Sequence, residues 1–319
     1  MLSQVGSRRA VLLSYFGVLG AAVMGKVFAT DAALAAAPSK GGKTGNHAFG
    51  VKDVVYQRNG GTERLARLYQ PAGAGPFPAL VMVHGGAWNN KDRTDGQNTA
   101  LDLCAAGIVV LSLDFRNAPE APYPASLQDI NLGIRWLKAH AKDFGSSPER
   151  VGLYGTSSGG HQAMLSAIRP DDVRYKAHVL PDGPGVDAKV AFVIAGWAVL
   201  YPLDRLAKAK EQGKKELITS HATFFKDDAT HVEATPALIL ERGEKVHLPP
   251  AMTFQGTMDE WTTAEQAERL GAAYRARGGT MDVLLYEGER HTFLNEHPAA
   301  PNSVKALAAV IAFIRKHAG

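Results

Sequence analysis

Cysteine is almost absent from this sequence: Cys104 is the only one among 319 residues. No disulfide can therefore form within the chain. Cys104 has apolar neighbours, so we expect a buried thiol, which packs like a small hydrophobic side chain. The sequence also lacks a cluster of cysteine and histidine with the spacing of a zinc site, so it gives no case for a metal.

Long runs of one charge are missing as well. The net charge is +4, and the first 35 residues hold three basic residues and one acidic residue, so the remainder carries +2. A nearly neutral chain without a basic run gives no case for nucleic-acid binding. Beyond the N-terminal segment no apolar run is long enough to cross a bilayer, and we expect no stable membrane insertion after processing.

The first 35 residues are typical of an export signal. Arg8 and Arg9 precede an apolar stretch over residues 11–24, and small residues follow it. The arginine pair resembles a twin-arginine signal, from which the sequence departs at two positions. We predict cleavage after Ala35, a flexible leader over residues 36–48, and a periplasmic or secreted location. An uncleaved membrane anchor is the alternative.

Strand and helix signals alternate from residue 49 onward, which predicts one catalytic domain over residues 49–319. Short apolar runs separated by amphipathic segments favour an α/β fold, with a mostly parallel sheet and helices on both faces. The clearest helix signal begins at Ser126, the expected N-cap. We expect strands over 51–57, 64–69, 79–83, 108–113, 151–155, 190–195, 251–255 and 281–286, and helices over 95–106, 126–144, 159–168, 262–277 and 303–316.

Residues 197–249 break this alternation. They hold Trp197, Tyr201, a lysine-rich helical stretch and the pair Phe224–Phe225. We predict an insertion that forms a partial lid over the C-terminal edge of the sheet. Surface decoration without a role in substrate binding is the alternative.

A G-x-S-x-G motif over residues 155–159 follows a strand signal and precedes a helix signal. A serine on such a tight turn projects from the top of the sheet, and the crowded backbone requires glycine two positions before and two positions after it. Ser157 meets this condition with Gly155 and Gly159, whereas Ser158 has no glycine two positions before it. Ser157 is therefore the candidate nucleophile.

Acyl transfer needs hydrogen-bond donors for the negative charge that develops on the carbonyl oxygen. The amide of Ser158, directly after the candidate nucleophile, is one predicted donor of an oxyanion hole. Residues 84–88 read H-G-G-A-W and follow an earlier strand, as the oxyanion loop does in esterases, so we predict Gly85 and Gly86 as further donors. From their positions in the loop, we assign Ala87 and Trp88 to the substrate pocket, and we expect Trp88 to pack beside the pocket. We expect His84 to support the loop.

A serine hydroxyl needs a base that takes its proton, and the base needs a carboxylate that fixes its tautomer. Asp259 and His291 each follow a strand signal, in the chain order serine, acid, histidine that such folds use. We expect both on loops at the face that carries Ser157. The remaining candidates are Glu260 as an alternative acid, His161 as a structural residue and His297 at the surface.

Together these motifs resemble the esterase and lipase branch typified by hormone-sensitive lipase, and more closely the exported acetyl-xylan and feruloyl-type esterases. The third glycine of the usual H-G-G-G loop is Ala87 here, which places the sequence near an H-G-G-x-W subgroup that includes arylformamidases. The resemblance implies the α/β-hydrolase fold, ester hydrolysis, no cofactor and the residue roles given above. The matching pieces lie over 84–88, 114–124, 155–161, 256–259 and 288–291.

We therefore predict a serine hydrolase that cleaves small-molecule carboxylic esters, of short-chain or acetyl and feruloyl type, through an acyl-enzyme intermediate. The first alternative is an arylformamidase-like amidase with the same triad, against which an export signal argues. A prolyl-oligopeptidase-like peptidase would need a large propeller domain, for which the chain has no room. The complete Ser/Asp/His set disfavours a non-catalytic binding protein.

Overall fold

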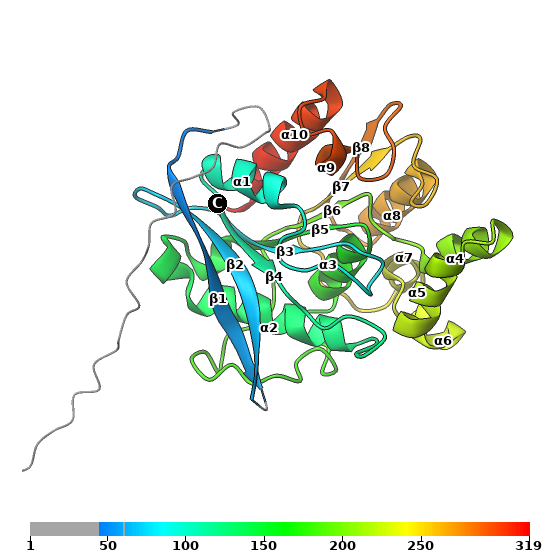
Figure 1. Cartoon of the computed structure of the whole chain (residues 1–319), viewed down its shortest axis with the longest axis horizontal. Coiled ribbons are helices and arrows are strands. Elements are labelled where there is room, and N and C mark those ends of the chain that lie inside the picture. The colour runs from blue at the N-terminus through cyan, green and yellow to red at the C-terminus, as the bar shows by residue number, and fades with distance from the viewer. Residues whose placement is uncertain (1–44, 60) are drawn as a thin grey trace, which may run out of the picture. The chain divides into compact units, whose positions relative to one another are not determined.

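The computed structural model describes residues 45–59 and 61–319 (Figure 1). In this part of the chain eight strands form one sheet, in the order β1-β2-β4-β3-β5-β6-β7-β8. The β1–β2 and β2–β4 pairs are antiparallel, and every other neighbouring pair is parallel. The strands are β1 (Phe49–Asn59), β2 (Thr62–Pro71), β3 (Ala79–Val83), β4 (Val109–Leu113), β5 (Val151–Thr156), β6 (Val193–Gly196), β7 (Ala251–Gly256) and β8 (Met281–Tyr286).

Helices lie on both faces of this sheet, as the alternation of signals predicts (Figure 1). Helices α1 and α10 pack on one face, while α2, α3 and α8 pack on the other. The helices are α1 (Gln97–Ala105), α2 (Ala125–Ala139), the 3-10 turns η1 (Ala141–Phe144) and η2 (Pro148–Arg150), α3 (Ser158–Ile168), α4 (Pro202–Glu211), α5 (Lys215–Phe225), α6 (Asp228–Glu233), α7 (Pro236–Glu241), α8 (Ala264–Ala276), α9 (Phe293–Glu296) and α10 (Pro301–His317).

The central strands are buried on both faces, which explains their continuous apolar runs. In β3, Val81 and Val83 join the apolar cluster under α2 and α3, whereas Leu80 and Met82 join the cluster under α1 and α10. Cys104 lies in the second cluster and is fully buried, as expected. Burial raises the pKa of its thiol, which keeps the thiol protonated.

Several element boundaries differ from the predictions by a few residues, and α2 differs at both ends. Helix α2 begins at Ala125, directly after Pro124, so Ser126 lies inside the first turn and is not the N-cap. Among the described residues the buried Ser126 hydroxyl has no hydrogen-bond partner. Helix α2 also ends at Ala139, and the rest of the expected helix is the separate turn η1.

The predicted signal, residues 1–35, and the leader up to residue 44 lie outside the described residues. The last residues of the predicted leader contact the domain: the His47 amide donates to the Ala105 carbonyl at 3.1 Å, and its ring packs edge-on against Phe77. The predicted leader therefore extends too far at its C-terminal end. No helix in the described ranges is long and apolar enough to cross a membrane.

The parallel strands bring the candidate residues to one edge of the sheet. The loop over residues 84–88 follows β3, Ser157 follows β5, Asp259 follows β7 and His291 follows β8. The carboxyl ends of these parallel strands share that edge. Residues 197–249 run between β6 and β7 and contain α4 to α7, so they leave the sheet at the same edge.

Candidate active site

Ser157 occupies a strained turn between β5 and α3. Its φ of 54° and ψ of −122° lie in a region that residues other than glycine rarely adopt. The surrounding backbone holds this conformation: the Ser157 amide donates to the Gly196 carbonyl at 3.0 Å, and its carbonyl accepts from the Val199 amide at 3.1 Å. The hydroxyl is thereby presented at the end of the strand, as the motif predicts.

Close backbone contacts explain the two glycines around Ser157. A Cβ atom on Gly155 would lie 2.4 Å from the Gly159 carbonyl oxygen, and one on Gly159 would lie 2.2 Å from the Val83 carbonyl oxygen. Neither contact is sterically tolerable without movement of the main chain. The neighbouring Ser158 uses its hydroxyl differently, since its Oγ accepts from the Trp88 amide at 3.2 Å.

A hydrogen-bond chain connects the three predicted triad residues. His291 Nε2 lies 3.1 Å from Ser157 Oγ, and His291 Nδ1 lies 2.6 Å from Asp259 Oδ2. An ionised carboxylate only accepts, so Nδ1 carries the ring proton and Nε2 is free to accept the hydrogen of the serine hydroxyl. The arrangement gives a base poised on a hydroxyl and an acid that fixes the tautomer of the base.

The Asp259 carboxylate is buried and held by several donors. Its Oδ2 accepts from Thr262 Oγ1 at 2.7 Å and from Gln255 Nε2 at 2.9 Å, and its Oδ1 accepts from the amides of Trp261 and Thr262. Burial acts to raise the pKa of Asp259, but the hydrogen bond and charge of His291, with the Thr262 and Trp261 donors, outweigh it and lower that pKa. Asp259 is therefore an anion at neutral pH.

Sequence reasoning missed Gln255 and Thr262 as supports of Asp259. Both are buried polar residues next to a strand end, and nothing in their spacing distinguishes them from ordinary core positions. The competing candidates lie elsewhere: Glu260 and His297 are exposed, and neither hydrogen-bonds to Ser157 or His291 in the described part of the chain.

The loop over residues 84–88 passes beside Ser157 and lines the same cavity. A Cβ atom on Gly85 would lie 3.4 Å from the Ser157 Cβ, so this backbone passes directly against the serine. Gly86 has a φ of 94°, and a side chain there would meet the Asn90 carbonyl oxygen at 2.4 Å. Glycine is therefore required at Gly86, whereas at Gly85 a side chain would make a tight contact. The amide of Ser158 starts α3, where the first amides have no partner within the helix.

His84 supports this loop, as predicted. Its Nδ1 donates to the Gly85 carbonyl at 2.9 Å, and its ring stacks on Phe115 with centroids 4.0 Å apart. Burial lowers the pKa of His84, so the ring is neutral.

Trp88 does not line the cavity at Ser157, which corrects its assignment to the substrate pocket. It is buried behind the loop, stacks on Phe224 and donates from Nε1 to His161 Nδ1 at 3.2 Å. His161 Nε2 then donates to the Ala234 carbonyl at 2.7 Å, and burial lowers the pKa of His161 to about 3. His161 is thus a neutral structural residue that joins α3 to the segment over residues 197–249.

A cavity of about 280 Å³ opens at Ser157 and His291. Gly85, Gly86 and Ala87 form part of its wall, so Ala87 stands where the sequence places it. The segment over residues 197–249 contributes three residues, Trp197, Arg205 and Leu217, to this wall. The remaining lining residues are Asn90, Lys91, Asp95, Thr156, Trp261, Thr292 and Asn295.

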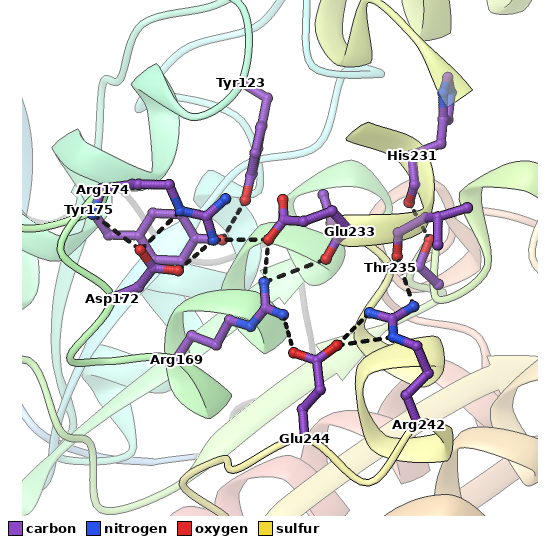
Figure 2. Close-up of polar contacts among 12 residues, drawn as sticks. Tyr123, Arg169, Asp172, Arg174, Tyr175, His231, Glu233, Thr235, Arg242 and Glu244 are labelled. Carbon is purple, nitrogen blue, oxygen red and sulfur yellow. Dashed lines mark hydrogen bonds and ion pairs between the residues drawn. The ribbon is translucent and has the colours of Figure 1, made fainter. Parts of the chain in front are cut away.

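Ion pairs fasten the inserted segment to the end of α3 (Figure 2). Arg169, which follows α3, pairs with Glu233 and Glu244, two carboxylates that flank α7 (Figure 2). Arg174 pairs with Glu233 from the neighbouring loop. The network therefore ties the part of the inserted segment around α7 to the far end of the helix that begins at the serine turn.

Within the described ranges no group of three or more His, Cys, Asp or Glu residues is arranged to hold a metal ion. The polar groups along the cavity wall include the Ser157 hydroxyl, the His291 imidazole and the Arg205 guanidinium. This set suits proton transfer and the stabilisation of an oxyanion.

A family model described as BD-FAE matches residues 67–274, a range that begins in β2 and includes Ser157 and Asp259. The chain belongs to the BD-FAE family. Among its relatives, the carboxylic ester hydrolase LipN of Mycobacterium tuberculosis is 30% identical over 266 residues, which cover 79% of this chain and 66% of LipN. The esterase LipC of the same organism is 28% identical over 213 residues, covering 65% of this chain and 52% of LipC.

Solved structures confirm the fold. The carboxylesterase EstE1, cloned from a metagenomic library, superposes with a TM-score of 0.70 at 21% identity, covering 86% of this chain and 92% of EstE1. This likeness confirms the predicted α/β-hydrolase fold. The family match and the relative LipN confirm the predicted resemblance to the esterase branch of that fold. The chain spans about half to two thirds of the length of the curated relatives LipN and LipC.

Proposed function

We propose that this protein hydrolyses carboxylic esters, with Ser157 as nucleophile, His291 as general base and Asp259 as the acid that orients the base. The observation that carries the proposal is the continuous hydrogen-bond chain from Asp259 through His291 to Ser157, which ends at a cavity. The relatives named above are ester hydrolases, which supports the reaction class. They lend no support to the formamidase alternative.

The reaction proceeds in two halves. Ser157 Oγ attacks the ester carbonyl carbon while its proton moves to His291 Nε2, and Asp259 stabilises the imidazolium. His291 returns that proton to the leaving alcohol, and the acyl group stays on Ser157. A water molecule then gives a proton to His291 and attacks the acyl carbon. The carboxylic acid leaves when His291 reprotonates Ser157.

The amides of Gly85, Gly86 and Ser158 form the proposed oxyanion hole. The close approach of Gly85 to Ser157 and the position of Ser158 at the start of α3 support this role. Each donor of this kind is worth about 10²–10³ in rate. Ala87 lies next along the loop and borders the substrate.

The cavity favours a short acyl group. Its volume of about 280 Å³ lies just below the roughly 300–1,000 Å³ of ordinary ligand pockets. Trp197, Leu217 and Trp261 are bulky side chains of its wall. We therefore propose acetyl to butyryl esters as substrates, and we propose the inserted residues 197–249 as the partial lid that sets this limit.

The test is hydrolysis of 4-nitrophenyl acetate, butyrate and decanoate by the purified protein. We expect turnover of acetate and butyrate, at least tenfold lower kcat/KM for decanoate, and no turnover by Ser157→Ala. A folded wild-type protein that leaves all three esters intact would refute the esterase proposal, and equal rates on all three would refute the short-chain limit.

We also propose that the protein is exported to the periplasm or beyond, on the strength of the signal-like residues 1–35. Expression of the full chain and mass spectrometry of the product from the periplasmic fraction test this. A product that begins at Ala36 is expected, and an unprocessed product retained in the cytoplasm would contradict it.

A further inference from the structure

Arg205 is a buried cation in the wall of the candidate active site. It lies on α4, 4% exposed, and shares the cavity with Ser157 and His291. Burial lowers the pKa of Arg205 to about 10, although the negative charge of Asp259 acts to raise it. The guanidinium therefore still carries its charge at neutral pH. A buried cation is costly for a fold unless another group compensates the charge.

The charge of Arg205 has no directly paired carboxylate within the described residues. Arg205 takes part in none of the ion pairs there, and its Nη2 is buried without a hydrogen-bond partner. Asp259 is committed to His291 and its other donors. Asp95, the other carboxylate beside the cavity, pairs with Lys91 at 2.8 Å. Lys91 therefore has an ion-pair partner, whereas Arg205, the other described cation of the cavity wall, has none.

Two neighbours, His221 and Trp88, hold the Arg205 side chain in place. Its Nε donates to His221 Nε2 at 3.1 Å, and its Cζ lies 4.7 Å from the centroid of the Trp88 ring. Because arginine can only donate, His221 must carry its proton on Nδ1, which donates to His231 Nε2 at 3.2 Å. Burial lowers the pKa of both histidines, so both rings are neutral and add no counter-charge.

This arrangement leaves a fixed guanidinium in the wall of the cavity at Ser157, with its Nη2 unpartnered in the described part of the chain. A guanidinium is the group that best matches the two oxygens of a carboxylate. We propose that Arg205 is a specificity residue that binds a carboxylate of the substrate, so that the preferred substrates are acidic esters. The proposal rests on the esterase function proposed above. The carboxylate belongs either to the acyl part, as in a half-ester of a dicarboxylic acid, or to the alcohol part.

Paired substrates of nearly equal shape test this and separate the two sources. For the acyl side, mono-4-nitrophenyl glutarate is compared with its methyl ester; for the alcohol side, 3-acetoxybenzoate is compared with its methyl ester. We expect the wild-type protein to favour the charged member of one pair by at least tenfold in kcat/KM. Arg205→Met should lose about 10²-fold on that charged ester, mainly through KM, and less than threefold on the neutral one.

Two further variants control for charge and shape. Arg205→Lys keeps the charge without the fork and should retain part of the preference. Lys210→Met removes one charge from the exposed side of the same helix and should leave both rates unchanged. A loss by Arg205→Met that is equal on charged and neutral esters would overturn the proposal, because it would assign Arg205 to the oxyanion or to folding.

A measurement on the wild-type protein alone avoids any folding defect of the variants. Glutarate and benzoate are compared with glutaramide and benzamide as competitive inhibitors of 4-nitrophenyl acetate hydrolysis. At least tenfold tighter inhibition by one carboxylate than by its amide is expected. Active hydrolysis of 4-nitrophenyl acetate with no preference for charge, in substrates or inhibitors, would overturn the role of Arg205 alone. Inactivity on every ester would instead refute the proposed function, and this proposal with it.

Discussion

Replacement of Asp259 by asparagine tests how the site fixes its base. The carboxylate accepts from both backbone amides of the loop on one oxygen, and from His291 Nδ1 at 2.6 Å on the other. In Asp259→Asn the amide oxygen is needed by the backbone donors, so the NH₂ group faces His291. The imidazole must then accept at Nδ1 and carry its proton on Nε2, toward Ser157. In that tautomer it cannot take the serine proton.

The expected loss is large and confined to kcat. A wrong tautomer in a triad of this kind lowers kcat by about 10⁴, which corresponds to about 5.5 kcal/mol in the activation barrier. KM should change little, because Asp259 does not line the cavity. Steady-state kinetics on 4-nitrophenyl acetate measure both constants, with Glu260→Gln as the matched control. A loss below tenfold in Asp259→Asn, or an equal loss in Glu260→Gln, would refute the assignment.

Three further predictions concern the turn and the buried histidine behind it. Gly159→Ala places a Cβ 2.2 Å from the Val83 carbonyl oxygen, so it should abolish activity and lower the free energy of unfolding by about 1–3 kcal/mol. The control Gly185→Ala, where a Cβ meets open space, should change neither. Urea titrations in which both variants match the wild type would contradict this prediction. His161 has a pKa of about 3 when folded against an ordinary 6.5, so below pH 6.5 the unfolded chain binds a proton that the folded chain refuses. As the pH is lowered from 6.5 to 3, the free energy of unfolding should decrease by up to about 1.4 kcal/mol per pH unit. His161→Gln should reduce this dependence on pH, and the same dependence in the variant and the wild type would contradict the argument. Trp88→Phe keeps an aromatic ring but leaves His161 Nδ1 without its hydrogen-bond donor. The free energy of unfolding measured by urea titration should decrease by about 1–3 kcal/mol, while 4-nitrophenyl acetate is still hydrolysed. An unchanged urea midpoint would argue against that hydrogen bond.

The sequence is most informative where the backbone itself is constrained. Gly155 and Gly159 are the residues that a tight turn around Ser157 requires, and the structure supplies the contacts that exclude a side chain at each. Asp259 and His291 are predictable because each directly follows a strand, and parallel strands end at one edge. The eight strands are predictable as well, because their apolar runs are short and are bounded by turn signals.

Side chains that reach the site from a distance are not predictable in this way. Arg205 is one cation in a lysine-rich stretch, and only the packing of α4 against Trp88 and His221 directs it into the cavity. The neighbours of Trp88 in the loop predict a place in the pocket. Its backbone instead has a positive φ, and its ring is buried in the core. Ser126 resembles an N-cap, but the helix begins one residue earlier, after Pro124.

Covalent labelling of the serine tests the central claim most directly. The protein is treated with diethyl 4-nitrophenyl phosphate, which phosphorylates an activated serine, and the modified peptide is identified by mass spectrometry. We predict one adduct per chain, on Ser157, in step with the loss of 4-nitrophenyl acetate hydrolysis, and no adduct on Ser157→Ala. An adduct on Ser158 or on any other residue, or hydrolysis that survives in Ser157→Ala, would contradict the account.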